Sequence, residues 1–299
     1  DYTKLSELIV SICKKYHKKG FSLVNYFTMS AEMCDCFDNR RAGVKYILNQ
    51  IKKIKYSSYI FSKYGLIKLN SKRKVPQDGV GSYNWYASAL YLSKLIDNGI
   101  LIDFGSTTCD FSIIKNGNIQ NRRTSDIDGM LTKELLYTGC SRTPIYAHIS
   151  EVRYRNKIYS IIPESFSSMS DINIILGNLS KGDIYSKSSD GSSHSLLQSY
   201  KRLSRSFGFD YDRSHKNLIN SLCSKIYNNQ VNLIEKTLSF HSKKFFERTN
   251  FVVVGLGLGS RIIRNMCKKN RYDYLDIRDI LNKTIVNGDY LSNLFPAFV

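Results

Sequence analysis

The chain has 299 residues, of which 42% are hydrophobic, and 44 Lys and Arg against 25 Asp and Glu give it a formal net charge of +19. This length allows two modest domains or one large one with a proper core, and no apolar run is long enough to predict a membrane span. The basic residues are scattered instead of gathered in a tail, so we interpret them as a lysine-rich surface and not as a nucleic-acid site.

The seven cysteines are an odd number without the spacing of a zinc site, which indicates free thiols in a reducing cytoplasm. The N-terminal segment 3–19 has apolar residues at helical spacing and does not look like a signal peptide. We therefore expect a cytoplasmic protein with no membrane and no nucleic-acid partner. Its oligomeric state is left open.

The first third of the chain alternates between helical and strand patterns. The spacing of apolar residues predicts helices over 3–19 and 40–54, and strands over 22–29, 57–61 and 64–69. A polar loop, 71–81, leads into a further helix that begins near Asn84 and stops at Gly99.

The rest of the chain begins with the stretch ILIDFGSTTCDFSII, which predicts strands over 100–103 and 108–114 with a tight KNGN turn after them. A helix is expected over 126–136, strands over 158–163 and 172–179, a mobile Ser/Gly-rich loop over 180–195, and helical structure over 196–246. The segment 251–269 has the pattern of a buried strand, a glycine turn and a helix. This order predicts an α/β fold with two lobes.

The first candidate site is the turn DFGSTTCD, which runs from Asp103 to Asp110. Gly105 lets backbone N–H groups approach an anion, and the hydroxyls of Ser106, Thr107 and Thr108 are further donors. Asp103 at the strand end can hold Mg²⁺ that neutralises a diphosphate. An ordinary β-hairpin is the alternative, although it needs neither the acid before the turn nor the run of hydroxyls.

The second candidate site is the glycine turn GLGLGS, in which Gly255 and Gly257 follow a buried strand and precede a helix. A helix N-terminus after such a turn favours phosphate groups. Close packing of the strand on the helix is the equally simple alternative, because no complete dinucleotide-binding pattern surrounds the turn.

The third candidate site is the segment around ELLYTGCSRTP. Asp126, Met130 and Glu134 are spaced four residues apart, so a helix over 126–136 would carry both acids on one face. Arg142 in a loop framed by Gly and Pro suits bidentate binding of an anion. A solvated acidic helix face is the alternative.

These motifs, together with TMSAEMCDCFDNRRAGV (28–44), SYNWYASA (82–89) and MSDINIILGNL (169–179), resemble one family in the same order along nearly the whole chain. The family comprises tetrahydromethanopterin-linked one-carbon pathway proteins and the synthase that forms the aminomethylfuran–phenoxymethyl ether in methanofuran biosynthesis. It is hydantoinase/oxoprolinase-like. The resemblance therefore implies a two-lobed actin/sugar-kinase/heat-shock-chaperone (ribonuclease H-like) fold.

The resemblance also implies a reaction, in which the phenol oxygen of a glutamyltyramine displaces diphosphate from an aminomethylfuran methyl diphosphate. Asp103 would hold Mg²⁺ and Asp110 or Glu134 would orient the phenol. Gly105 to Thr108, with Arg142, would bind the diphosphate, whereas the turn with Gly255 and Gly257 departs from the family's usual Gly-Gln-Gly-like version. The expected partners are therefore a small-molecule diphosphate and a phenolic amine.

The resemblance further implies a first lobe over 1–97 that lacks the family's opening strand and first phosphate loop, so the fold is expected to be truncated at its N-terminus. The second lobe, 98–299, would carry the DFGSTTCD loop and the GLGLGS turn. Two other functions stay open. One is an ATP-dependent small-molecule kinase or oxoprolinase-like enzyme of the same fold, and the other is a non-catalytic basic binding protein.

Overall fold

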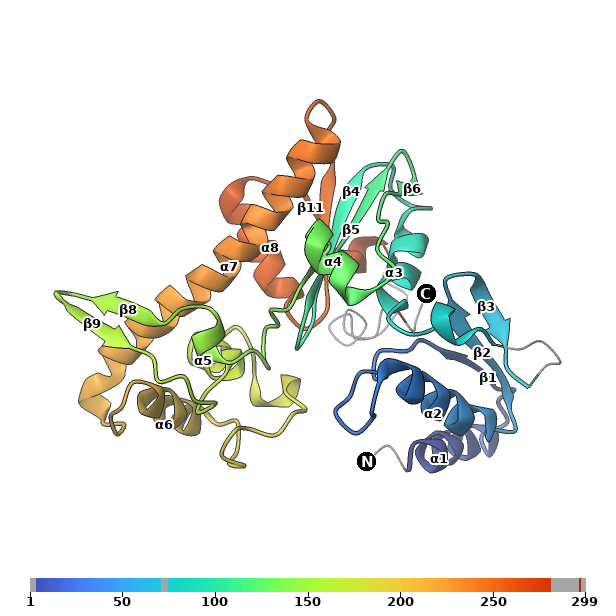
Figure 1. The fold of residues 1–299 in the computed structure, drawn as a ribbon, viewed down its shortest axis with the longest axis horizontal. Coiled ribbons are helices and arrows are strands. Elements are labelled where there is room, and N and C mark those ends of the chain that lie inside the picture. Colours follow the sequence, from blue (N-terminus) through green and yellow to red (C-terminus); the bar gives the residue numbers. More distant parts are fainter. Residues whose placement is uncertain (1–3, 71–74, 281–295, 297–299) are drawn as a thin grey trace. The chain divides into compact units, whose positions relative to one another are not determined.

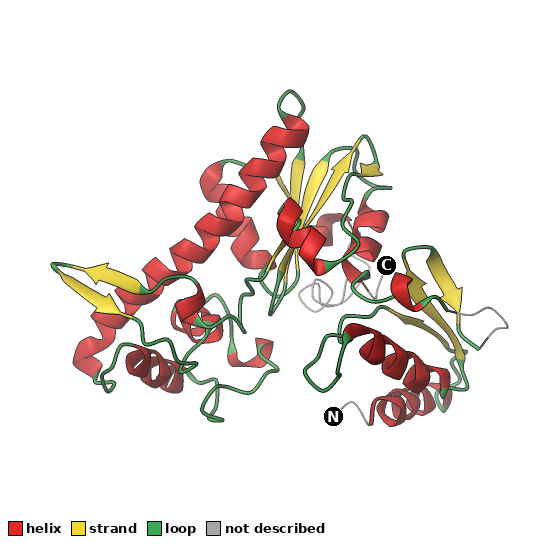
Figure 2. Ribbon diagram, viewed as in Figure 1, coloured by secondary structure: helices red, strands yellow, loops and turns green. Residues whose placement is uncertain are grey.

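The computed structural model describes residues 4–70, 75–280 and 296, and the chain divides into two compact units between Leu92 and Ser93. Unit 1 holds the described residues up to Leu92 together with Pro296, and unit 2 holds those from Ser93 onward. Both units combine helices and strands (Figure 1, Figure 2), and unit 2 contains a mixed sheet. The predicted α/β class is thus confirmed.

Unit 1 is a three-stranded sheet with helices against it. Its elements are α1 (Leu5–His17), β1 (Val24–Phe27), α2 (Arg40–Lys52), β2 (Ser57–Ser62), β3 (Gly65–Lys68), the 3₁₀ turn η2 (Gln77–Gly79) and α3 (Asn84–Leu92). Strand β1 pairs with β2 in parallel, and β2 pairs with β3 antiparallel. The apolar face of α2 packs with residues of β2 and β3 in one core, so the helical period predicted for 40–54 is confirmed.

Unit 2 is built on a six-stranded sheet whose order is β11-β10-β4-β5-β6, with β7 also paired to β5. Its strands are β4 (Gly99–Phe104), β5 (Cys109–Lys115), β6 (Asn118–Ile119), β7 (Leu135–Leu136), β10 (Val252–Leu256) and β11 (Tyr274–Leu275). Strand β4 lies parallel to β10 and antiparallel to β5. Positive φ angles at Asn116 and Gly117 form the tight KNGN turn that was predicted between β5 and β6.

The remaining elements of unit 2 surround this sheet and extend from it. They are α4 (Asp126–Thr132), η3 (Ile145–Ala147), β8 (Glu151–Tyr154), β9 (Lys157–Ser160), α5 (Met169–Ile175), η4 (Lys181–Asp183), α6 (Leu196–Ser206), η5 (Arg213–His215), α7 (Lys216–Phe246), α8 (Ser260–Asn270) and α9 (Ile277–Ile280). The strand predicted over 172–179 is wrong, because residues 169–175 form α5 with a capping box at Ser168. Its run of isoleucines is buried, and a short buried helix has no pattern that separates it from a buried strand.

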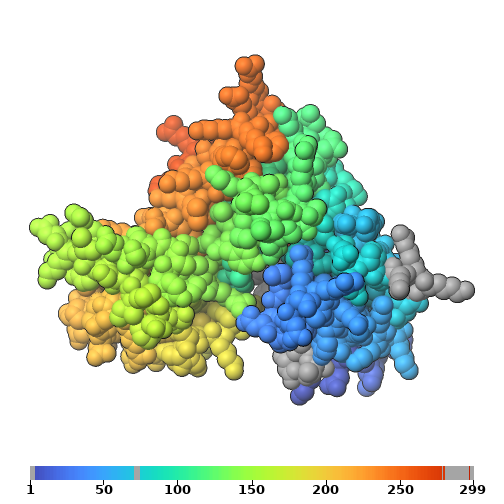
Figure 3. All heavy atoms as spheres, in the orientation of Figure 1, coloured from blue at the N-terminus to red at the C-terminus, as the bar shows by residue number. Residues whose placement is uncertain are grey.

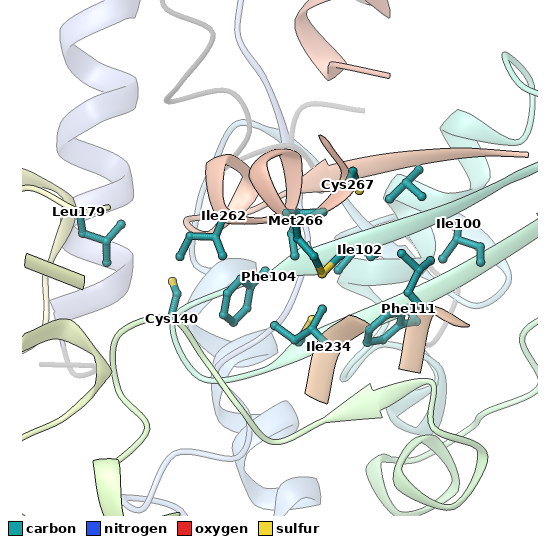
Figure 4. Close-up of a cluster of buried hydrophobic side chains, with 14 of the residues drawn as sticks. Ile100, Ile102, Phe104, Phe111, Cys140, Leu179, Ile234, Ile262, Met266 and Cys267 are labelled. Carbon is teal, nitrogen blue, oxygen red and sulfur yellow. The ribbon is translucent and has the colours of Figure 1, made fainter. Parts of the chain in front are cut away.

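The long helix α7 contributes to two separate cores of unit 2. Its C-terminal half packs Ile234 and Leu238 with β4, β5, β10 and α8, in the cluster shown in Figure 4. Its N-terminal half packs Leu222 and Ile226 with α5, α6 and β8. Figure 1 shows α7 running from the sheet to the β8–β9 hairpin, so one helix joins both cores.

The Ser/Gly-rich segment 180–195, predicted to be a mobile loop, is tied to α6 by a buried arginine. Arg202 is 1% exposed and donates to Asp171 Oδ1 at 2.7 Å, to Asp190 Oδ1 at 3.1 Å and to Ser192 Oγ at 2.8 Å. These charge-assisted bonds fix the loop on the helix. Among the described residues, no helix is long and apolar enough to cross a bilayer.

Candidate active site

Asp103 lies at the carboxyl end of β4, between the two neighbouring strands of the unit 2 sheet. In the strand register it stands opposite Asp110 of β5 and beside Leu256 of β10. Directly opposed residues of an antiparallel pair point to the same face of the sheet. The predicted hairpin therefore brings the first and last acids of DFGSTTCD together.

The glycine turn after β10 meets this strand end. Gly257 has a φ of +76°, and a Cβ built on it would lie 2.5 Å from Asp103 Oδ1 and 2.7 Å from Phe104 O. Gly259 N donates to Phe104 O at 2.8 Å. Only a residue without a side chain fits at position 257. The two motifs that were predicted separately are thus parts of one site.

Gly255 has a different environment from Gly257. It lies within β10, and a Cβ at this position would meet Tyr274 Oη at 2.9 Å and Ile263 Cβ at 3.2 Å. The absent side chain therefore makes room for β11 and α8. This contact is the strand–helix packing that the sequence left open as an alternative.

The environment of Asp103 favours its neutral form. Burial raises the pKa of Asp103 to about 7, the negative charge of Asp110 adds to this shift, and Arg123 opposes it. A carboxyl group with a pKa near neutrality can exchange a proton at physiological pH. Asp103 is therefore suited either to proton transfer or to binding a cation that removes the repulsion from Asp110.

Arg123, which the sequence did not single out, connects two of the predicted acids. Its side chain is 4% exposed, its Nη2 lies 2.5 Å from Asp110 Oδ1, and its Nη1 donates to the backbone oxygen of Glu134 at 3.4 Å. Thr108 Oγ1 donates to the other oxygen of Asp110 at 3.2 Å. Asp110 is thus held in place by a cation and a hydroxyl.

The helix predicted over 126–136 is too long, and this changes the position of Glu134. Helix α4 ends at Thr132, because Lys133 adopts a left-handed conformation with a φ of 61°. The prediction that Glu134 shares a helix face with Asp126 is therefore wrong. Glu134 turns inward beside β5, whereas Asp126 accepts a hydrogen bond from Tyr137 Oη at 2.7 Å.

Glu134 is 7% exposed, and its backbone oxygen accepts from Phe111 N at 2.8 Å. Its Oε1 accepts from Arg122 N at 3.5 Å, and its Oε2 has no hydrogen-bond partner among the described residues. A buried carboxylate oxygen without a donor is costly. Glu134 is therefore a candidate for contact with a group outside the chain.

The turn formed by residues 105–108, here called the hydroxyl-rich turn, packs against the loop 139–142. Gly105 N closes the turn on Thr108 O at 2.9 Å, Cys140 N donates to Gly105 O at 3.0 Å, and Arg142 N donates to Ser106 O at 2.9 Å. A Cβ at Gly139 would overlap the backbone of Ser106. The TGCSRTP segment therefore acts here through its backbone.

The side chains of Thr107 and Arg142 are exposed, and those of Ser106 and Thr108 are half-buried. The green segment that follows β5 and contains α4 forms part of the surface of unit 2 in Figure 3. Hydroxyls and a guanidinium on adjoining loops can contact an anion that arrives from solvent.

The sequence did not predict a polar cluster next to Gly139, because the residues of this cluster belong to no motif. Gln230 of α7 is fully buried and donates to Thr138 Oγ1 at 2.8 Å and to Gly139 O at 2.9 Å. His148 Nε2 lies 3.3 Å from Thr138 Oγ1, and burial lowers the pKa of His148. A single glutamine or histidine has no sequence signal for such a role.

The acids suit Mg²⁺ only if the substrate supplies further oxygens. Within the described residues no three His, Cys, Asp or Glu side chains are grouped as a metal site. Mg²⁺ is commonly held by one or two carboxylates together with water and substrate phosphates. Asp103 and Asp110 provide that minimal set.

Comparison with known proteins gives a consistent set of matches. The profile of the family described as hydantoinase/oxoprolinase matches residues 24–283. A (4-{4-[2-(gamma-L-glutamylamino)ethyl]phenoxymethyl}furan-2-yl)methanamine synthase of Methanocaldococcus jannaschii is 26% identical over 295 residues, which are 95% of this chain and 88% of the relative. The synthase of the same name from Methanococcus vannielii is 26% identical over 200 residues, or 66% of this chain and 89% of the relative.

A solved structure of nucleotide-free acetone carboxylase aligns with 73% of this chain and 32% of its own chain, with a TM-score of 0.44 and 15% sequence identity.

Proposed function

Because this chain belongs to the hydantoinase/oxoprolinase family, we propose that it is a transferase of methanofuran-type cofactor biosynthesis. The family resemblance predicted from the motifs is confirmed by the profile match and by the two synthases. The substrates that we propose are an aminomethylfuran methyl diphosphate and the phenol of a glutamyltyramine. The proposal includes the two-lobed actin/sugar-kinase/heat-shock-chaperone fold and the tetrahydromethanopterin-linked one-carbon context.

The observation that carries the proposal is the meeting of three segments around Asp103: the hydroxyl-rich turn after β4, the glycine turn after β10 and the loop 139–142. In α/β sheets, ligands bind beyond the carboxyl ends of the strands. Hydroxyls, an exposed arginine and two opposed acids form a set that suits a diphosphate and its cation.

In the proposed reaction the bond between the furfuryl carbon and the diphosphate oxygen breaks, and its electron pair leaves with the diphosphate. The phenol oxygen forms the new ether bond to that carbon, and its proton passes to a carboxylate. Ser106, Thr107 and Arg142 would bind the leaving diphosphate, and stronger binding of its developing charge lowers the barrier.

We assign proton acceptance to Glu134, since Asp103 would hold the metal and Asp110 is already engaged by Arg123 and Thr108. When bound, Mg²⁺ would supply Lewis-acid stabilisation of the diphosphate charge. Asp103 and Asp110 would hold it.

The test is a diphosphate-release assay with the full chain, Mg²⁺ and both substrates. Asp103→Asn should lower the rate by about a hundredfold or more, since it removes the ionisable carboxyl group at the reacting centre. The matched control is Asp97→Asn, an exposed acid before the opposite end of β4. Its rate should equal that of the wild type.

If the wild type releases no diphosphate, or if Asp103→Asn is as active as Asp97→Asn, the proposal fails. Release of ADP from ATP in the same assay, without use of the furan diphosphate, would instead support an ATP-dependent enzyme of this family.

A further inference from the structure

Unit 1 contains a buried carboxylate at which two of the sequence motifs meet. Glu32 belongs to TMSAEMCDCFDNRRAGV, and Ser82 begins SYNWYASA. Ser82 Oγ donates to Glu32 Oε1 at 2.8 Å, and Arg40 Nη2 donates to Gly81 O at 3.0 Å. The proposed function has so far assigned no role to either motif.

The carboxylate of Glu32 lacks the partners that burial requires. The residue is 1% exposed, and its Oε2 has no hydrogen-bond partner among the described residues. The nearby cation is too far for a hydrogen bond, since Arg40 Nε lies 3.9 Å from Oε1. A buried carboxylate with one hydrogen bond and a long ion pair is costly unless another donor completes it.

The surrounding backbone is shaped to hold Glu32 in this position. A Cβ at Gly81 would lie 3.0 Å from Glu32 Oε1, and a Cβ at Gly43 would overlap the backbone oxygen of Glu32. Ser82 has a φ of +55°, which is uncommon for a residue with a side chain. Local strain of this kind often accompanies a functional site.

The position of Glu32 in the fold suits ligand binding. It lies in the segment between the carboxyl end of β1 and the start of α2, and β1 pairs in parallel with β2. Such strand ends are where α/β sheets bind ligands. The side chain of Arg40, whose Nε lies 3.9 Å from Glu32 Oε1, is 31% exposed and donates to Gly81 O, so this cation reaches solvent beside the carboxylate.

We propose that Glu32 binds the protonated primary amine of a small-molecule substrate. An ammonium group is a compact cation with three donors, which matches a carboxylate oxygen that lacks a hydrogen-bond donor. A divalent cation fits less well, because no group of three metal-ligating side chains occurs in the described part of the chain. This amine site lies in unit 1 and is additional to the residues of unit 2 that the proposed function uses.

The experiment measures binding of two small probes to the full chain by calorimetry or ligand-observed NMR, in the absence of turnover. Furan-2-ylmethanamine carries the ammonium, and furan-2-ylmethanol is its neutral counterpart. The wild type should bind the amine at least tenfold more tightly than the alcohol. Glu32→Gln should abolish this preference while leaving the affinity for the alcohol unchanged.

Two further variants keep the test decisive. Glu7→Gln, an exposed acid on α1 of the same unit, should retain the preference for the amine. Arg40→Gln removes the cation that competes for Glu32 and should raise the affinity for the amine several-fold. This second variant decides the matter even if Glu32→Gln fails to fold.

The proposal is overturned if the amine preference is absent from the wild type, survives in Glu32→Gln, or falls in Arg40→Gln. Mg²⁺ binding that depends on Glu32, without any preference for the amine, would also overturn it. The diphosphate-release assay tests the proposed function independently of these binding measurements. A wild type that prefers the amine but releases no diphosphate would sink the proposed function and not the role of Glu32.

Discussion

Asp103 of unit 2 and Glu32 of unit 1 are two acids in similar positions with different partners. Asp103 lies at the carboxyl end of β4 and Glu32 lies in the segment after β1, and both strands have a parallel neighbour. Each acid lies against glycine backbone, Gly257 for Asp103 and Gly81 for Glu32. Asp103 is opposed by Asp110, whose charge is matched by Arg123 at 2.5 Å. Among the described residues, Glu32 has only Ser82 and a distant arginine as polar partners.

The two acids differ in whether the chain itself balances the charge around them. In unit 2 the chain itself supplies most of the charge balance, so the acids have a defined geometry before any ligand arrives. In unit 1 the balance is incomplete, and a partner from outside the chain would complete it. The predictions below test this contrast, from the largest expected effect to the smallest.

The largest effects are expected from adding a methyl group against the hydroxyl-rich turn in unit 2 and against the backbone of Glu32 in unit 1. Gly139→Ala places a Cβ against the backbone of Ser106, and Gly43→Ala places one against the backbone of Glu32. Backbone atoms cannot rotate away as side chains can, so each variant should lose about 3 kcal/mol or more of its free energy of unfolding. Hydrogen exchange resolved by peptide should locate the loss in unit 2 for Gly139→Ala and in unit 1 for Gly43→Ala.

The control for both glycines is Gly182→Ala, where a Cβ would meet only Ser180 Oγ at 3.8 Å. Its stability should stay within about 0.5 kcal/mol of the wild type. Normal stability of Gly139→Ala or Gly43→Ala would mean that the close backbone contacts are absent in solution.

The two arginines should differ in their contribution to stability. Arg123→Gln leaves Asp110 without its cation in a nearly buried site and should cost about 2–3 kcal/mol. Arg40→Gln removes a long, partly exposed ion pair and should cost less than about 1 kcal/mol. The loss of unfolding free energy in each variant is measured by urea denaturation monitored with hydrogen exchange. Equal losses would contradict the contrast between the units.

The stability of the wild type should depend on pH through Asp103. Its pKa is raised from 3.8 to about 7, so the folded state retains a proton that the unfolded state releases. Stability therefore falls as the pH rises from about 4 to 7, and the loss is complete above that range. Asp103→Asn cannot ionise and should gain roughly 4 kcal/mol relative to the wild type across this window, at about 1.4 kcal/mol for each unit of the shift.

The measurement is the melting temperature or the free energy of unfolding of both proteins between pH 4 and 8. Asp97→Asn is again the control and should follow the wild type at every pH. A constant difference between Asp103→Asn and the wild type would show that Asp103 titrates normally.

A smaller effect is expected behind the hydroxyl-rich turn. Gln230→Leu removes the donors to Thr138 Oγ1 and Gly139 O and should destabilise unit 2 by about 1–2 kcal/mol. Asn228→Leu replaces an exposed carboxamide side chain of α7 with leucine and is the matched control. If both variants unfold alike, Gln230 does not support the loop.

Local patterns predicted those parts of the molecule that depend on nearby residues. The strands around DFGSTTCD and the KNGN turn follow from alternation and from Asn-Gly. The strand, glycine turn and helix after Phe251 follow from a buried run and three spaced glycines. The segments that meet at Asp103 could be named, but their contact depends on β10 pairing with β4 across about 150 residues of chain.

The errors have identifiable physical causes. The helix over 126–136 was extended past Thr132 because Lys133 has no sequence signal for a left-handed conformation. Arg123 could not be separated from its neighbour Arg122 until the fold placed it beside Asp110. Glu32 was part of a motif, yet its missing hydrogen-bond partner is a property of packing alone.

Helix α7 has a mechanical consequence for unit 2. Its 31 residues form a rod about 46 Å long, given a rise of 1.5 Å per residue. Tyr227, near its middle, packs against both cores, and Gln230 lies one turn further along. The helix joins the two cores, and Gln230, which supports the hydroxyl-rich turn, lies close to its centre. Dividing unit 2 into separately expressed halves would leave each with only part of the rod that its core needs.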